Sequence, residues 1–410
     1  MARDKPRIVC LDLDTFFVSV ERLLDPSLEG KPVIVGGRPG SRGVVTACSY
    51  EVRRLGVRSG ISLTRASQLA PNAIYLSTRH DTYGPYAARV REVAEQWCPI
   101  VQVASIDEMY MDFAGCEALY RKPEDTSDDE TIRRVVREIT ATIKQDIGLP
   151  SSAGIATSRS MAKVACGLAK PAGVLLVPRG AERDTLAPLP VRKLPGIGPV
   201  AEEALAKIGI RTLGEVAATP LERLRKVFGA WAEHVKRTAV GEGSGDLGRD
   251  RPAFSEHDPE GEIIGSISNE RTFHEDVRRP EIIDAMLCSL TERVCWRARK
   301  RGIKGRTVTL KLRYANFHTI SRSRTFSPTH SELELYPVVR EIYEEARDPH
   351  RPIRLLGLQL SNLGFFDEQI NLFQDGERLH STVDKIRERF GFDAVRLAES
   401  TRTKRRTRSD

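Results

Sequence analysis

The sequence lacks the features that mark membrane, secreted and metal-thiolate proteins. None of its 410 residues belongs to an apolar run of about 18, so no membrane-spanning helix is expected. The N-terminus leads into a strand-like segment without the apolar core of a signal peptide. The seven cysteines are scattered and form no Cys-x-x-Cys pair, which is typical of reduced thiols. We therefore expect a cytoplasmic protein with no disulfide framework and no membrane partner.

Positive charge is in excess. Lys and Arg number 64 against 56 Asp and Glu, for a formal net charge of +8, while 40% hydrophobic residues is ordinary for a soluble globular chain. At about 100–200 residues per domain, the length predicts two to four domains. A basic chain of this kind favours a polyanionic partner, nucleic acid before an anionic membrane.

Two adjacent carboxylates, Asp107 and Glu108, interrupt the apolar residues 103–113. Neighbouring side chains of a continuous strand point to opposite faces, so these two can converge only where the backbone turns. We therefore predict a hairpin whose tight turn is residues 106–109, with both carboxylates at its tip. Two close anions repel unless a cation lies between them, and oxygen ligands suit Mg²⁺ or Mn²⁺. A solvated acidic turn is the alternative.

A second acidic strand end favours the metal site. Residues 8–11 form a continuous apolar run, typical of a strand covered on both faces, and Asp12 follows at its C-terminal end. Ligand crevices of α/β sheets open at such ends. The structural alternative is a helix N-cap, for which Asp14 is better placed.

The order of elements predicts two related cores. Up to about residue 182 the pattern is strand, helix, hairpin, helix, strand, helix, which is a split β-α-β, ferredoxin-like core. Short helices follow, and Gly196 and Gly198 form a turn that feeds a helix N-terminus. This turn fits a helix-hairpin-helix that offers N–H groups to a phosphate, or a plain helix–helix turn.

After a linker rich in Gly, Asp, Arg and Pro, the same strand–helix–hairpin–helix–strand order returns without the acids. We expect its exposed face to contact phosphates through four cations: Lys311, Arg313, Arg322 and Arg324. Beyond it the composition turns polar. A short apolar peptide, QINLF, occupies residues 369–373, and the basic end of the chain is expected to be disordered.

Taken together, several motifs in order resemble those of the Y-family translesion DNA polymerases, most closely the bacterial DinB or DNA polymerase IV group. They are LDLDTFF at residues 11–17, SYEVR at 49–53, SIDE at 105–108, AKVA at 162–165, AKP at 169–171 and LPGIG at 194–198. The resemblance runs from residue 8 to about 363.

The resemblance implies an α+β, right-hand polymerase. Its parts would be a ferredoxin-like palm (1–18 and 77–182), small fingers (19–76), a helical thumb with the helix-hairpin-helix (183–245), a linker (246–257), a separate little-finger domain of ferredoxin-like topology (258–365) and a flexible tail (366–410). The implied function is template-directed, low-fidelity DNA synthesis past lesions, on primer-template DNA with dNTPs, by a monomer.

The resemblance also implies roles for single residues. Asp12, Asp107 and Glu108 would be the catalytic carboxylates that bind two Mg²⁺ ions, with Mn²⁺ as an alternative, and Leu13 would add its backbone carbonyl. Phe17 would be the steric gate that excludes a ribose 2′-hydroxyl, although it could also be a core residue of its helix. The nucleotide-binding set would be Phe16, Phe17, Tyr50, Arg53 and Lys163.

The peptide at residues 369–373 resembles the motif that binds the bacterial sliding clamp, with Gln369, Leu372 and Phe373 as anchors. Its structural alternative is a strand remnant that packs on the little finger. Two other functions stay open at this point. One is a non-catalytic protein of the same fold that bridges DNA and the clamp; the other is a nucleotidyl cyclase, whose core can share this topology.

Overall fold

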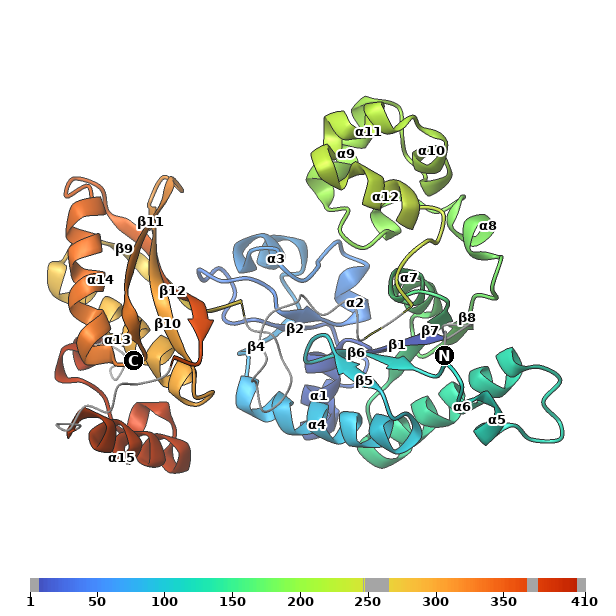
Figure 1. The fold of residues 1–410 in the computed structure, drawn as a ribbon, viewed down its shortest axis with the longest axis horizontal. Helices are drawn as coiled ribbons and strands as arrows, with labels where there is room; N and C mark the ends of the chain where they lie inside the picture. Colours follow the sequence, from blue (N-terminus) through green and yellow to red (C-terminus); the bar gives the residue numbers. More distant parts are fainter. Residues whose placement is uncertain (1–6, 246, 248–264, 367–374, 404–410) are drawn as a thin grey trace. The chain divides into compact units, whose positions relative to one another are not determined.

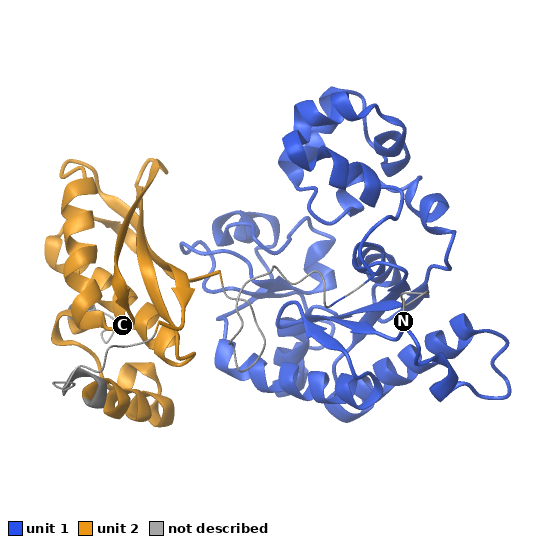
Figure 2. Ribbon diagram, in the orientation of Figure 1, with its two compact units in different colours: residues 1–251 blue, residues 252–410 orange. Residues whose placement is uncertain are grey.

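The computed structural model describes residues 7–245, 247, 265–366 and 375–403. The chain divides into two compact units, residues 1–251 and 252–410 (Figure 2). The division falls inside the predicted linker 246–257, most of which lies outside the described residues. All seven cysteines are free. Within the described ranges, no helix has the length and apolar character needed to cross a membrane.

A five-stranded sheet forms the centre of the first unit (Figure 1). Its order is β5-β6-β1-β7-β8. The strands are β1 (Ile8–Leu13), β5 (Val101–Val103), β6 (Glu108–Asp112), β7 (Ser151–Ala156) and β8 (Val174–Leu176). The first four make the expected ferredoxin-like core, and β8 extends it in parallel beside β7.

Helices cover both faces of this sheet. Val9 and Leu11 of β1 pack into one apolar cluster, and Ile8 and Cys10 pack into another on the opposite face. The first cluster includes α1 (Phe16–Leu24), α4 (His80–Trp97) and α6 (Asp128–Thr142); the second includes α7 (Arg159–Ala169). This two-sided burial explains the continuous apolar run of β1.

Gly154 of β7 allows α7 to lie directly on the sheet. A Cβ atom there would come within 2.1 Å of the backbone nitrogen of Cys166 in α7. Any larger residue would therefore push the helix away from the strand.

Smaller elements make up the rest of the first unit. The fingers segment contains a three-stranded sheet of order β3-β2-β4 and two short helices. These are β2 (Val33–Val35), β3 (Ala47–Cys48), α2 (Tyr50–Arg53), α3 (Leu63–Leu69) and β4 (Ile74–Leu76). The thumb segment contains α8 (Glu182–Leu186), α9 (Pro199–Lys207), α10 (Leu213–Ala218), α11 (Leu221–Phe228) and α12 (Ala232–Thr238). A short helix, α5 (Glu117–Tyr120), precedes α6.

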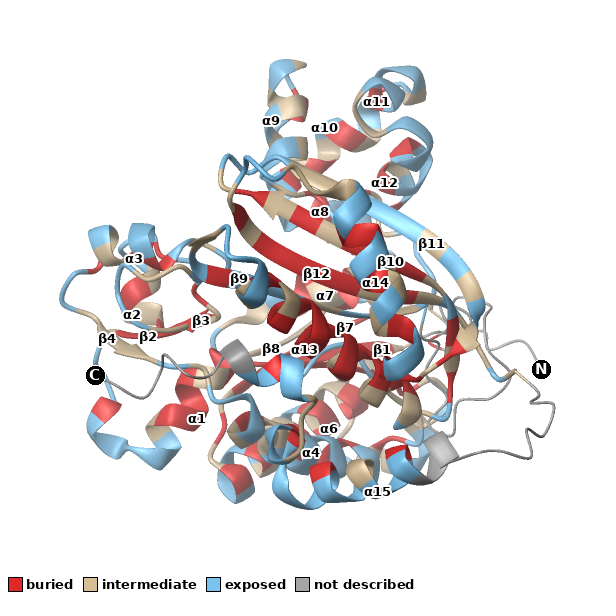
Figure 3. Cartoon of the chain, turned by 90° about the vertical axis from the view of Figure 1, so that its left-hand side faces the viewer, coloured by how far each residue is buried: buried red, intermediate tan, exposed pale blue. Residues whose placement is uncertain are grey.

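The second unit repeats the strand–helix–hairpin–helix–strand order with a sheet order of its own, β11-β10-β12-β9. Its elements are β9 (Ser266–Val277), α13 (Pro280–Arg299), β10 (Lys304–Tyr314), β11 (Thr319–Thr329), α14 (Glu332–Ala346) and β12 (Ile353–Gly364). Buried residues gather where β10 and β12 face α13 and α14 (Figure 3). The opposite face of this sheet carries polar side chains.

The prediction of a flexible tail over residues 366–410 is wrong for 375–403. This stretch forms α15 (Asp375–Phe390) and two short 3₁₀ turns (Phe392–Ala394 and Ala398–Thr403). Arg387 of α15 is 1% exposed and lies 2.6 Å from Glu292 of α13, which is 0% exposed. The polar composition of this stretch did not predict its packing on α13, because the charged side chains that make the contact are buried as ion pairs.

Candidate active site

The backbones of the three predicted acids meet at the C-terminal end of β1. In the antiparallel pairing of β1 with β6, Asp12 lies directly opposite Glu108. The backbone N–H of Leu13 donates to the carbonyl of Asp107 at 2.9 Å. The hairpin is confirmed, but its turn is residues 104–107, because Val103 already pairs with Met109. Glu108 is therefore the first residue of β6 rather than part of the tip.

Each of the two paired carboxylates has a lysine partner. The ammonium of Lys163 in α7 binds Glu108, and that of Lys170, just after α7, binds Asp12. The hydroxyl of Tyr110 also donates to Glu108, at 2.7 Å. Lys163 was expected at the triphosphate, whereas Lys170 was missed as a site residue although its motif AKP was recognised.

The electrostatics of Asp12 fit a cation site. Burial raises the pKa of Asp12, the ion pair with Lys170 opposes the rise, and the charges of Asp107 and Glu108 add to it. Several carboxylates whose charges repel one another at short range supply the hard oxygen donors that Mg²⁺ prefers. Among the described residues, no three His, Cys, Asp or Glu side chains lie close enough together to form a ready metal site. The donor set thus fits divalent metals, with the lysines neutralising the carboxylates as they stand.

The expectation that Asp14 caps α1 is wrong. The N-cap is Thr15, in a left-handed conformation with φ 47° and no side-chain capping bond. Asp14 is instead 1% exposed and accepts hydrogen bonds from several segments.

Tyr50 and Arg53 begin and end α2 of the fingers, near the same strand end. The guanidinium of Arg53 lies 5.0 Å from the centre of the Tyr50 ring. The Tyr50 hydroxyl donates to Asp14 at 3.1 Å. Burial is the largest effect that raises the pKa of Tyr50 to about 12, and the nearby charge of Asp14 adds to it. This tyrosine therefore remains a neutral hydrogen-bond donor at neutral pH.

Phe16 and Phe17 have different environments. The Phe16 side chain is 3% exposed and lies in the palm core, so its predicted role in nucleotide binding is wrong for the side chain. Phe17 is only partly buried. Its ring stacks on that of Tyr83, with 4.1 Å between the two ring centroids. The buried Tyr83 is in turn held by Glu21, to which its hydroxyl donates at 2.7 Å. Tyr83, which fixes the ring of Phe17, was missed because it lies 66 residues away.

The predicted thumb turn depends on glycine at one position. Gly196 has φ +92°, and a Cβ atom there would lie 2.4 Å from the ring of Trp231. Gly198 is the N-cap of α9 and has open space around its Cα. The turn before α9 therefore keeps a bare backbone that a phosphate could approach.

The four cations of the second unit do not share one face. Lys311 lies opposite Ser321 and Arg313 opposite Thr319 on the open side of the sheet. Arg324 lies opposite the buried Val308 and forms ion pairs with Glu341 and Glu345 of α14, and Arg322 lies opposite the buried Leu310. The prediction of one exposed cationic face is thus wrong for Arg322 and Arg324, because cross-strand neighbours share a face.

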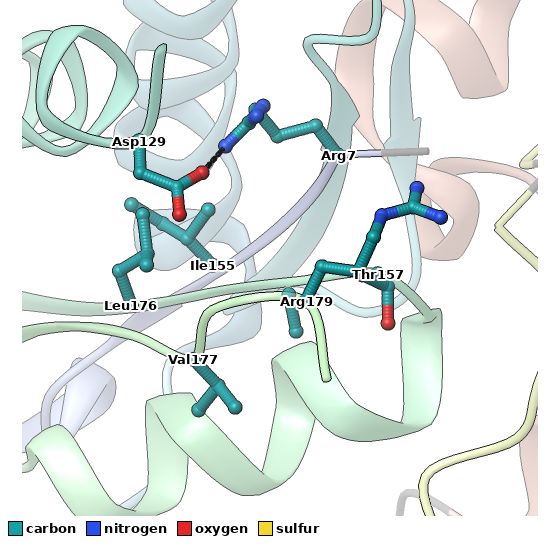
Figure 4. A pocket seen from close by; sticks show the side chains of 8 residues that line it. Arg7, Asp129, Ile155, Thr157, Leu176, Val177 and Arg179 are labelled. Atoms are coloured by element: carbon teal, nitrogen blue, oxygen red, sulfur yellow. Dashed lines mark hydrogen bonds and ion pairs between the residues drawn. The ribbon is translucent and has the colours of Figure 1, made fainter. Parts of the chain in front are cut away.

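Two cavities on the palm lie away from the carboxylates. One, of about 30 Å³, is lined by Arg7, Asp129 and Arg179 among others, and an ion pair joins Arg7 to Asp129 (Figure 4). The other, of about 520 Å³, is lined by Arg137 and Lys144 among others. Neither includes Asp12, Asp107 or Glu108.

Comparison with known proteins gives consistent matches along the chain. Residues 11–167 match the impB/mucB/samB family, residues 265–372 its C-terminal domain, and residues 179–210 the IMS family HHH motif. A DNA polymerase IV of Dehalococcoides mccartyi strain CBDB1 is 36% identical over 97% of this chain and 98% of its own length. One of Pelotomaculum thermopropionicum is 34% identical over 96% and 95%.

Solved structures share the fold. A Y-family polymerase chimera of Dbh and Dpo4 has a TM-score of 0.73 and 24% identity, and it covers 87% of this chain and 98% of its own. The insertion ternary complex of Dbh DNA polymerase has a TM-score of 0.58 and 25% identity with the same coverage.

The ferredoxin-like palm with its acids, the small fingers and the helix-hairpin-helix define a right-hand polymerase. The full-length similarity then identifies the family: the chain belongs to the Y-family DNA polymerases of the DinB type. It is a DNA-directed DNA polymerase of the translesion class, which excludes the scaffold and cyclase alternatives. The predicted clamp anchors Gln369, Leu372 and Phe373 lie outside the described residues.

Proposed function

We propose that the palm joins a dNTP to a primer 3′-hydroxyl through two Mg²⁺ ions, with Mn²⁺ as an alternative. Asp12, Asp107 and Glu108 would bind the ions, and the Leu13 carbonyl would add a ligand on the nucleotide side. The observation that carries this proposal is the direct pairing of Asp12 with Glu108 across β1 and β6. The backbone hydrogen bond from Leu13 to Asp107 brings the third acid to the same strand end.

When bound, two metal ions activate the attacking hydroxyl and neutralise the leaving pyrophosphate in an in-line displacement. The bond that forms joins the primer oxygen to the α-phosphorus, and the bond that breaks joins that phosphorus to the bridging oxygen of pyrophosphate. Lys163 and Lys170 would move from the carboxylates to the triphosphate oxygens, beside Tyr50 and Arg53. We assign no side chain as a general base.

Phe17 would set sugar selectivity. Its ring is partly exposed at the start of α1, and the stacking on Tyr83 limits its movement. An aromatic ring held in place beside the sugar would exclude a 2′-hydroxyl, so deoxynucleotides would be preferred.

Primer-template DNA would be held mainly through its phosphates. The turn of Gly196 and Gly198 offers backbone N–H groups. The open face of the second sheet offers Lys311 and Arg313 together with cross-strand hydroxyl pairs, such as Thr309 with Ser323 at 2.8 Å. The described relatives support DNA and nucleotide as substrates, since one solved relative is named an insertion ternary complex.

Primer extension tests the catalytic assignment. Purified wild-type protein should extend a primer with dNTPs and Mg²⁺, whereas Glu108→Gln should be nearly inactive. Glu29→Gln is a matched control because this carboxylate is exposed and follows the 3₁₀ turn Pro26–Leu28 that comes after α1. If Glu108→Gln extends primers as well as Glu29→Gln does, the metal assignment is wrong.

We also propose that Gln369, Leu372 and Phe373 bind the bacterial sliding clamp, and that the polymerase acts as a cytoplasmic monomer. The support is the sequence match and its place between β12 and α15. Pull-down by purified clamp should be lost in Leu372→Ala/Phe373→Ala but not in Leu379→Ala, an exposed residue of α15. Equal binding by both variants would discredit the peptide.

A further inference from the structure

Asp14 is a buried carboxylate surrounded by donors. One oxygen accepts from the Tyr50 hydroxyl at 3.1 Å and lies 3.7 Å from the ammonium of Lys170. The other accepts from the Ser152 hydroxyl and from the backbone N–H of Ala172, both at 2.7 Å. We call these groups the Asp14 network.

The network joins three segments that are far apart in the sequence. Tyr50 belongs to α2 of the fingers, Ser152 to β7 of the palm, and Lys170 and Ala172 to the turn after α7 (Figure 1). The backbone of Asp14 is anchored as well, since its N–H donates to the carbonyl of Pro150 at 2.9 Å and its carbonyl accepts from Ser19 at 2.7 Å. Hydrogen bonds to both the side chain and the backbone of Asp14 therefore fix the position of this carboxylate.

The groups around Asp14 suit a carboxylate better than an amide. All four groups that face its oxygens are donors, and a carboxylate is acceptor-only with room for about four bonds. An asparagine amide would turn an NH₂ group toward either Tyr50 and Lys170 or Ser152 and Ala172. The amide would therefore leave one side of the network poorly paired in a buried site.

We propose that Asp14 is a positioning residue for the incoming nucleotide: it holds Tyr50 and Lys170 beside the triphosphate site until the nucleotide binds, when the hydroxyl and the ammonium turn to the triphosphate oxygens. The inference rests on the proposed function, because it takes Tyr50 and Lys170 to be triphosphate contacts. Asp14 itself touches neither nucleotide nor metal in this assignment. It acts by keeping Tyr50 of the fingers and Lys170 of the palm close to the same carboxylate oxygen.

Steady-state incorporation of a single dNTP tests this role. Asp14→Asn should raise KM for the dNTP about tenfold, the effect of one poorly paired buried donor, while kcat changes less than about threefold. The Kd for primer-template should be unchanged, because no DNA contact is assigned to the network. Asp25→Asn, the same change at the exposed far end of α1, should behave as wild type.

A double-mutant cycle separates positioning from a general fold defect. Tyr50→Phe removes the hydroxyl through which Asp14 acts on the fingers. The increase in KM of the double variant should therefore be clearly smaller than the product of the increases of Asp14→Asn and Tyr50→Phe. Ser152→Ala provides a second route if Asp14→Asn fails to fold. The hydroxyl of Ser152 donates to Asp14, so its loss should raise KM for the dNTP about two- to threefold in a protein that still folds with a cooperative thermal transition.

Unchanged KM in Asp14→Asn, or strictly multiplicative KM effects in the cycle, would overturn the inference while leaving the polymerase assignment intact. If Asp14→Asn does not fold, an unchanged KM in Ser152→Ala overturns it. Failure of the proposed function gives a different result, since Glu108→Gln would then extend primers as well as Glu29→Gln does.

Discussion

The palm and the second unit are built from the same order of elements, yet only the palm can assemble a catalytic site. In the palm, the first and third strands of the order, β1 and β6, are neighbours in the middle of the sheet. In the second unit the corresponding strands, β9 and β11, form opposite edges. Acids placed at matching positions there would be kept apart by two intervening strands.

The two sheets also differ in how they are covered. Helices bury both faces of the palm sheet, which leaves the C-terminal end of β1 as the accessible place for polar chemistry. Helices cover one face of the second sheet and leave the other polar. One order of elements thus yields a group of acids at a strand end in one case and an open polar face in the other, because strand order and covering differ.

The largest expected effect is on the pairing of Asp12 with Glu108 in the palm. Asp12→Asn should lower kcat/KM for dNTP incorporation by roughly 10³-fold, since it removes a charge that we propose binds the metals. Glu270→Gln is the matched change in the second unit, where the carboxylate pairs with Lys311 on the open face, and it should leave kcat/KM for the dNTP unchanged. Comparable losses in both variants would contradict the division of labour between the two sheets.

The next effect concerns how α15 is held to the second unit. Glu292→Ala leaves the buried Arg387 without its closest partner, so the free energy of unfolding should fall by about 3–5 kcal/mol. The exposed pair of Arg91 and Glu95 in the palm offers a control, and Glu95→Ala should cost less than about 0.5 kcal/mol. Denaturant unfolding of the full chain measures both. Equal losses would mean that α15 is not anchored by this pair.

A smaller effect is expected for Phe17, the proposed sugar gate of the palm. Phe17→Ala should raise the ratio of ribonucleotide to deoxynucleotide incorporation by about 10–100-fold, because one excluded group is worth a few kcal/mol in a binding site. Phe16→Ala is the neighbouring control. It should destabilise the core, where Phe16 is buried, without changing this ratio. An unchanged ratio in Phe17→Ala would remove it from the proposed role.

Local patterns were enough to predict the elements and that the three acids would lie at one strand end. The apolar run of β1 and the interrupted hairpin are short-range signals, and each ends at a carboxylate. The partners that complete the site were beyond such signals: Lys170 lies 158 positions from Asp12, and Tyr83 stacks on a residue 66 positions away. Asp14 was misassigned for the same reason, since a capping role needs only local residues and its true partners are distant. Strand order, which placed Arg324 on the helix-covered face, is likewise a long-range property.

The smallest effect distinguishes the two faces of the second sheet. Arg313 and Arg324 lie on neighbouring strands but on opposite faces, and Arg324 is paired with Glu341 and Glu345 at 2.6 Å each. Arg313→Ala should weaken primer-template binding a few-fold and lower the slope of log Kd against log salt by about one, as expected for one lost phosphate contact. Arg324→Ala should leave that slope unchanged, since its charge is already neutralised within the fold. Titrations at several salt concentrations measure both. If Arg324→Ala lowers the slope and Arg313→Ala does not, DNA binds on the helical side, and the open face has no part in holding it.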